Sequence, residues 1–217
     1  MKCVGYTDEM KMGWLRSAIG SVIVAGLAAG TVLHVARAEG GKACAPVRYM
    51  DNSYTVCQFD VRRDRIELFW RDGAKEAFGN FRRLRQYLTD QGKELSFAMN
   101  AGMYNEQLAP IGLYVEDNQS FKSANQRDGP GNFHLKPNGV FYIAGGKAGV
   151  AETGAFTKSG IKPRIASQSG PMLVIDGMLH PRFLKTSTSR KRRNGVGVKD
   201  GGNTVIFVIS EGFVTFH

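Results

Sequence analysis

Three polar residues that could take part in chemistry stand where apolar runs of the chain begin or end. Asn100 closes the run "LSFAMN", Arg193 directly precedes the Gly-rich segment "NGVGV", and Glu211 follows "TVIFVIS". An amide both donates and accepts hydrogen bonds, and a guanidinium can hold two phosphate oxygens at once. A carboxylate can activate water, bind a sugar hydroxyl or act as a nucleophile. The sequence leaves these three roles of Glu211 open.

Each of the three residues also has a plainer interpretation. The basic run Arg190–Arg193 would be ordinary on any solvated surface. Glu211 could be a charged residue that prevents an edge strand from pairing with another chain. Asn100 could simply cap a turn. His134 and His180 are isolated imidazoles without an assigned role, and neither a Ser-His-Asp order nor a phosphate-binding glycine loop is visible.

Short apolar and β-branched runs recur along the chain and predict strands. They begin at Tyr54, Arg65, Leu95, Gly139, Met172 and Thr204. Residues that tolerate positive φ separate several of them, which predicts hairpins and largely antiparallel pairing. The predicted turns are Pro137-Asn138-Gly139, Asp176-Gly177 and Asp200-Gly201-Gly202-Asn203.

One segment has the period of a helix, with Asn80 as its cap and Gly92 as its end. The apolar face is formed by Phe81, Leu84, Tyr87 and Leu88. The polar face carries Arg82, Arg83 and Arg85, interpreted as a solvated surface. The Gly-rich segment Gly145–Gly160 is expected to be a long, irregular connection. The fold class is therefore α+β, strand-dominated, with antiparallel hairpins and few helices.

The N-terminal region is typical of a secretory signal peptide. Lys11 and Arg16 precede a mildly apolar stretch, residues 18–33, and Ala36-Arg37-Ala38 follows as a cleavage site. Residues 1–38 are therefore predicted to be a leader, with an uncleaved anchor as the alternative, and residues 39–217 a single domain in the periplasm or secreted. In such a compartment Cys44 and Cys57 are expected to form a disulfide.

Four ordered stretches after residue 95 resemble the phosphodiester glycosidase family, in particular its exported bacterial branch. They are "NAGMY" from Asn100, "NFHLKPNGVF" from Asn132, "SQSGPMLVIDG" from Ser167 and "SRKRRNGVGVKDGGNTVIFVISEG" from Ser189. The family's C-terminal Asp-Gly-Gly-x-Ser motif has no counterpart before His217. The domain is accordingly expected to lack its C-terminal part, and its activity in this form is an open point.

The resemblance implies hydrolysis of a sugar phosphodiester at the anomeric carbon. Phosphate is a good leaving group, so the main needs are anion binding and stabilisation of an oxocarbenium-like centre. The residues implied as catalytic are Glu211, Asn100 and Arg193, with Arg193 on the phosphate. The residues implied as substrate-binding are Gly102, Tyr104, Phe133, Ser169, Gly170 and Asn194. Core packing is the alternative for the aromatic residues, and a strand-linking turn for Ser169 and Gly170.

The predicted partner is a sugar phosphodiester, or an anionic glycan if the domain binds without catalysis. The net charge of +10 suits either one. Nucleic acid conflicts with the leader, and a membrane would be met only through an uncleaved leader. No cofactor is assigned. A divalent cation could bind Glu106, Asp117 or Asp176, although these residues lack the spacing of a calcium loop.

Overall fold

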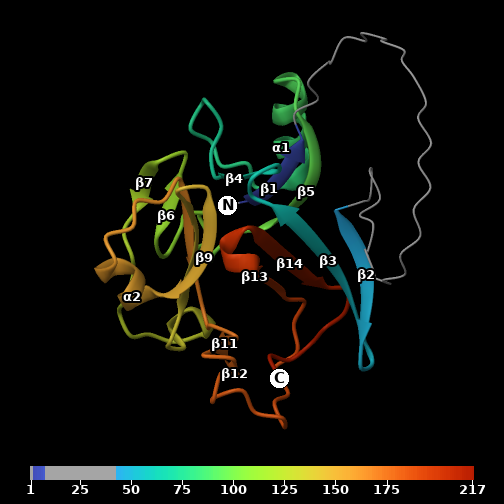
Figure 1. Ribbon diagram of the computed structural model, residues 1–217, viewed down its shortest axis with the longest axis vertical. Helices are drawn as coiled ribbons and strands as arrows, with labels where there is room; N and C mark the ends of the chain where they lie inside the picture. Colours follow the sequence, from blue (N-terminus) through green and yellow to red (C-terminus); the bar gives the residue numbers. More distant parts are fainter. Residues whose placement is uncertain (1, 8–42) are drawn as a thin grey trace, which may run out of the picture. The chain divides into compact units, whose positions relative to one another are not determined.

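The computed structural model describes residues 2–7 and 43–217, and its strands form four antiparallel sheets (Figure 1). Of the predicted leader, residues 1–38, only residues 2–7 are described, so its apolar stretch and cleavage site lie outside the described residues. Each strand predicted from the sequence is present, so the strand-dominated α+β class is confirmed. Within the described range, every helix is too short or too polar to span a bilayer.

A four-stranded sheet carries the C-terminal strands, in the order β13-β14-β3-β2. Cys44 and Cys57 lie directly opposite each other on β2 and β3 and form the predicted disulfide. The turn Asp200–Asn203 joins β13 to β14, with positive φ at Asp200, Gly201 and Gly202, as predicted. The strands are β2 (Cys44–Tyr49), β3 (Asn52–Asp60), β13 (Asn194–Lys199) and β14 (Thr204–Ser210).

A three-stranded sheet has the order β4-β1-β5, with β1 (Lys2–Thr7) between β4 (Arg65–Phe69) and β5 (Glu94–Asn100). Figure 1 shows β1 alongside β5. This strand was not predicted, because residues 1–38 were all assigned to the leader. A chain cut after Ala38 would lack the strand that joins β4 to β5. The leader itself stays a prediction.

Helix α1 (Phe81–Asp90) covers one face of β5. Its N-terminus is capped as predicted, since the Arg83 amide donates to Asn80 Oδ1 at 2.9 Å. Leu84 and Leu88 are fully buried and pack with Phe78 and Leu95. The face that carries Phe81 is exposed, which leaves α1 with one core face and one open face.

A five-stranded sheet has the order β7-β6-β10-β8-β9. The strands are β6 (Tyr114–Glu116), β7 (Gln119–Lys122), β8 (Gly139–Ala144), β9 (Lys147–Glu152) and β10 (Ile165–Ser169). The irregular connection expected over residues 145–160 is wrong, because this segment contains β9 and the short helix α2 (Thr153–Lys158). The sequence of β9, "KAGVAE", consists largely of small residues, so it lacks the clear alternation of apolar and polar side chains by which a strand is recognised.

The turns that flank this sheet gave one correct and one incorrect prediction. Asp176-Gly177 joins β11 (Val174–Ile175) to β12 (Met178–Leu179), as expected. Pro137-Asn138-Gly139 does not connect a hairpin, because a 3-10 turn (Asn132–His134) precedes it and β8 pairs with β9 and β10. Its Asn138 serves a buried polar cluster instead.

Aromatic side chains from all three large sheets meet in one core. Phe97 of β5 stacks on Phe207 of β14, with ring centroids 5.2 Å apart, and Phe59 of β3 lies 5.6 Å from Phe97. Phe141 of β8 meets Phe207 edge-on at 6.1 Å. Burying each such ring contributes roughly 2 to 3 kcal/mol. The core therefore holds the end of β5 and the end of β14 in fixed relation.

Candidate functional site

A cleft of about 570 Å³ lies between α1, β5 and the ends of β3 and β14. We call it the Glu211 cleft. Its walls are polar at the rim, where Glu211, Thr55, Arg82 and Arg85 stand, and largely apolar below. The lining residues are Thr55, Phe81, Arg82, Arg85, Leu95, Ser96, Phe97, Ala98, Ile209 and Glu211.

Glu211 is held at this rim by one hydrogen bond of its side chain and one of its backbone amide. The Thr55 hydroxyl donates to Glu211 Oε1 at 2.5 Å, and the Glu211 amide donates to the Ser53 carbonyl at 2.9 Å. Within the described part of the chain, Glu211 Oε2 has no hydrogen-bond partner. An exposed carboxylate oriented through one oxygen keeps the other available to a ligand. The end of β14 therefore places Glu211 in the lining of the cleft, and its catalytic role stays a prediction.

Asn100 and Asn194 lie together, although 94 positions separate them. Asn194 Nδ2 donates to the Asn100 carbonyl at 2.7 Å, so the end of β5 is joined to the start of β13. This contact adjoins the cleft, because Ala98 of β5 lines it and Ile209, which also lines it, is the register partner of Asn194. Two of the residues implied by the resemblance thus come from different sheets to one place.

Arg193 is anchored to the C-terminal segment and is not among the residues that line the cleft. Its Nε donates to the Val214 carbonyl at 3.1 Å and its Nη2 to the Ser189 carbonyl at 2.9 Å. The guanidinium also covers the ring of Phe216, 3.6 Å from the ring centroid. Burial lowers the pKa of Arg193. Described residues engage two of the five N–H groups of its side chain, which leaves three without a partner in that part of the chain.

A ladder of stacked side chains extends from Arg193. Phe216 stacks on Phe183, and Phe183 stacks on His180, with 4.9 Å between ring centroids in both pairs. His180 is buried and contacts the Lys136 carbonyl at 3.2 Å. The loop that follows β12 therefore contributes to the position of Arg193. Sequence reasoning left His180 without a role, because nothing local connects it to Phe216.

The remaining substrate-binding candidates are not brought to the cleft. Phe133 is only 2% exposed, and this burial fits its alternative interpretation as a core aromatic. Gly170 packs so closely that an added Cβ would lie 2.5 Å from the Phe133 carbonyl oxygen. Ser169 is exposed at the end of β10, and Tyr104 is exposed in the loop that Gly102 begins, with positive φ at Gly102.

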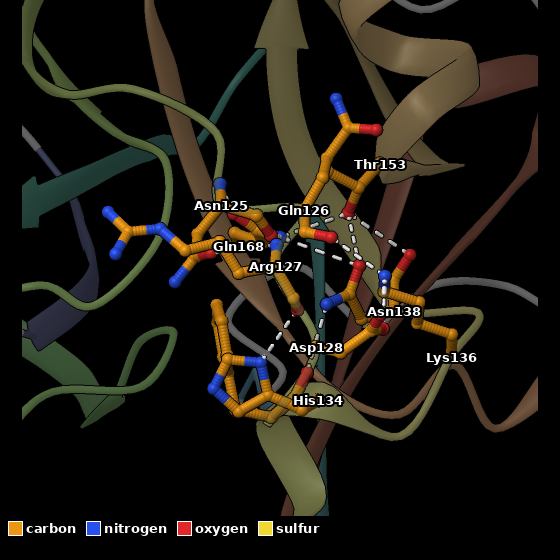
Figure 2. Close-up of polar contacts among 10 residues, drawn as sticks. Asn125, Gln126, Arg127, Asp128, His134, Lys136, Asn138, Thr153 and Gln168 are labelled. Carbon is orange, nitrogen blue, oxygen red and sulfur yellow. Dashed lines mark hydrogen bonds and ion pairs between the residues drawn. The ribbon is translucent and has the colours of Figure 1, made fainter. Parts of the chain in front are cut away.

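Near Phe133 lies a buried polar cluster that sequence reasoning missed (Figure 2). We call it the Gln168 cluster, and its members are Asn125, Asn138, Thr153 and Gln168. Gln168 Oε1 accepts from the Leu113 and Asn125 amides at 3.0 and 2.9 Å, and its Nε2 donates to the Asn125 carbonyl at 2.7 Å. Thr153 donates to Asn138 Oδ1 at 2.7 Å.

The edge of this cluster is occupied by contacts within the same loop, residues 125–138. Figure 2 shows Lys136 directed at the Gln126 carbonyl and at Asp128, both 2.7 Å from Nζ. His134 Nδ1 lies 2.9 Å from the Arg127 carbonyl. Among the described residues, the side chains of the Gln168 cluster bond to one another and to nearby backbone groups, which ties β10 to this loop.

A metal centre is not evident in the described residues, where no three His, Cys, Asp or Glu side chains gather. Glu106, Asp117 and Asp176, the carboxylates considered for a cation, are each exposed in separate loops. Cation binding by these residues stays a prediction.

Fold and site together define an antiparallel α+β domain whose cleft offers a carboxylate, two hydroxyls and two guanidinium groups, with two asparagines beside it. The model of the phosphodiester glycosidase family matches residues 93–217, and the chain belongs to this family. The matched region contains β5, β13, β14 and Glu211, but α1 lies before it.

One curated relative is the uncharacterized protein YigE of Escherichia coli (strain K12). It is 38% identical over 169 residues, which cover 77% of this chain and 65% of YigE. The match thus spans just under two thirds of the relative's length. Because YigE is itself uncharacterized, the likeness adds support for the family and says nothing further about the substrate.

Proposed function

We propose that this domain hydrolyses a sugar phosphodiester at the anomeric carbon, with Glu211 as the carboxylate at the reacting centre. The observation that carries the proposal is the position of Glu211, held through one oxygen at the rim of a cleft that the Asn100–Asn194 contact adjoins. Membership of the phosphodiester glycosidase family supports the reaction class.

The proposed reaction adds water to the anomeric carbon and breaks its bond to the phosphate oxygen. The electron pair of that bond leaves with the phosphate monoester, so little general-acid assistance is needed. A carboxylate next to the carbon stabilises the positive charge that develops on the ring. Glu211 Oε2 is the oxygen suited to this role, because Thr55 occupies Oε1.

The other proposed roles follow from donor chemistry. Arg193 binds the phosphate through its three unused N–H groups, and its anchoring to Ser189, Val214 and Phe216 fixes its direction. The Asn100 side chain contacts a sugar hydroxyl or a phosphate oxygen. Tyr104, Ser169 and Gly102 do not line the cleft, so their proposed role is limited to parts of the substrate that extend beyond it.

The test uses methyl N-acetyl-α-glucosaminyl phosphate and measures free N-acetylglucosamine. Glu211→Gln is expected to lower kcat by about 10² to 10⁴, the usual contribution of a carboxylate that acts as acid, base or nucleophile. Glu94→Gln, which removes an exposed carboxylate at the start of β5 that does not line the cleft, is the matched control. Equal activity of wild type and Glu211→Gln would reject the site, and absence of sugar release from any glycosyl phosphodiester would reject the reaction.

A second candidate function is the binding of an anionic glycan without catalysis. The exposed guanidinium groups of Arg82 and Arg85 in the cleft favour it, together with the net charge of +10. Under this proposal, binding to a polyanionic glycan weakens steeply as salt is raised and no product forms. Binding that is insensitive to salt would exclude it.

Export is the proposed location of either activity. The predicted leader supports it, and so does the Cys44–Cys57 disulfide, because disulfides persist in oxidising compartments. Cell fractionation checks this proposal directly. Recovery of the chain in the cytosol with both thiols reduced would contradict it.

A further inference from the structure

The open face of α1 brings two guanidinium groups into the cleft that contains Glu211. Arg82 and Arg85 are three positions apart, which places them on the same side of a helix, and both line the cleft. Sequence reasoning assigned them to a solvated surface with Arg83. The structure separates the three residues, because only Arg83 is turned away.

Arg83 is neutralised by two carboxylates. Its Nη2 lies 2.5 Å from Asp72 Oδ2 and 2.8 Å from Glu76 Oε2, and a further bond goes to the Ala77 carbonyl. Within residues 2–7 and 43–217, neither Arg82 nor Arg85 has an ion pair or a side-chain hydrogen bond. One helix thus carries a paired arginine on one side and two unpaired arginines toward a cavity.

The charge of the cleft is therefore unbalanced. Among the ionisable residues that line it, two are cationic and one, Glu211, is anionic. Unpaired guanidinium groups bind phosphate well because their N–H donors match its oxygens in a bidentate geometry. The apolar wall formed by Leu95, Phe97 and Ile209 gives the same cavity a surface for a non-charged part of the ligand.

Arg193 and the α1 pair are distinct sources of positive charge. Arg193 is held by the C-terminal segment and does not line the cleft. Arg82 and Arg85 belong to α1, which packs on β5 of a different sheet. Two separate sets of guanidinium donors near one carboxylate suit a ligand with two anionic groups. A cavity of this volume falls in the range of about 300 to 1,000 Å³ that holds extended small-molecule ligands.

We propose that Arg82 and Arg85 form a second anion subsite, so that the substrate is a glycosyl phosphodiester with an additional phosphate on its alcohol side. Two linked units of a glycosyl-phosphate polymer have this chemistry. The proposal rests on the proposed function for the substrate class, while the anion subsite itself is testable by binding alone. Arg82 and Arg85 are specificity-determining residues in this account.

The binding test titrates the full chain with inorganic pyrophosphate in a calorimeter. Arg82→Gln/Arg85→Gln is expected to weaken binding at least about tenfold, since loss of charge-assisted hydrogen bonds of this kind corresponds to a factor of ten or more. Arg83→Gln, on the same helix, is expected to stay within about twofold. Absence of binding to wild type, or an equal loss in Arg83→Gln, would overturn the subsite.

The kinetic test compares two diesters of N-acetyl-α-glucosamine 1-phosphate, one with ethanol and one with 2-phosphoethanol. Wild type is expected to prefer the second in kcat/KM by about tenfold, and Arg82→Gln/Arg85→Gln to lose most of this preference. Activity on both diesters with an unchanged preference would reject the subsite and keep the proposed function. Pyrophosphate binding that depends on Arg82 and Arg85, without hydrolysis of either diester, would keep the subsite and reject the proposed function.

Discussion

The Gln168 cluster and the Glu211 cleft are both polar, yet they use their polar groups in opposite ways. In the cluster, Gln168 is 1% exposed and its amide engages several partners on surrounding segments. In the cleft, Glu211 Oε2 and the guanidinium groups of Arg82 and Arg85 have no partner among the described residues. A buried polar group costs stability unless it is paired, whereas an open one is free to meet a ligand.

The largest effect on stability is expected from removing Gln168, the centre of the cluster. Gln168→Leu leaves the Leu113 and Asn125 amides without their acceptor. Each unsatisfied buried amide costs about 1 to 3 kcal/mol, so the free energy of unfolding should fall by about 2 to 6 kcal/mol in a urea titration. Gln119→Leu, on the exposed strand β7, is the control. A loss no larger than that of the control would mean that the cluster does not support the sheet.

The second test fills space beside the same cluster. An added Cβ at Gly112 would lie 2.4 Å from Gln168 Oε1 and 2.7 Å from the Phe133 ring. Gly112→Ala should therefore cost about 1 to 3 kcal/mol through overpacking, measured by urea unfolding. Gly197→Ala on β13 is the matched control, because no described atom beyond the adjacent residues lies within 4 Å of the added Cβ. Equal effects at the two glycines would contradict the close packing around Gln168.

These contrasts also show what the sequence could and could not predict. Period and turn residues predicted β3, β5, β14, α1 and the Asp176-Gly177 turn, because each signal is local. The Gln168 cluster was missed, since its members are contributed by segments up to 43 positions apart and each is an unremarkable polar residue alone.

Only some of the residues that line the cleft could be singled out from the sequence. Glu211 was singled out from its place after an apolar strand, but its position in one cleft with α1 depends on how the sheets pack. Arg82 and Arg85 look like Arg83 in the sequence. Only the position of Asp72 and Glu76 distinguishes them, and this depends on how the segment before α1 folds back.

The third test asks whether the cleft matters for stability. Glu211→Gln retains an oxygen that can accept the Thr55 hydroxyl, and residue 211 is exposed. The free energy of unfolding should therefore change by no more than about 0.5 kcal/mol, as for ordinary surface substitutions. Urea titration of the same variant used for kinetics provides the measurement. A loss of several kcal/mol would mean that Glu211 is structural, and its effect on activity would then need no catalytic role.

The smallest effect concerns Glu116, a half-buried carboxylate of β6 that contrasts with Glu211. It accepts hydrogen bonds from the Tyr114 hydroxyl at 2.6 Å and from the Trp70 amide at 3.1 Å. Burial nevertheless raises the pKa of Glu116, and these hydrogen bonds offset the shift only in part. Folding therefore favours the protonated form of this side chain.

The sign of the pH dependence follows from that shift. The contribution of Glu116 to stability is complete below its unfolded pKa of about 4.3 and is lost as the pH rises through the higher folded-state pKa. Glu116→Gln stays neutral, so wild type should lose stability relative to this variant as the pH rises above about 4, until it has passed the folded-state pKa of Glu116. Other carboxylates titrate in both proteins and cancel in the difference. A difference that stays constant would show that the hydrogen bonds cancel the effect of burial, and one that grows in favour of wild type would show that they outweigh it.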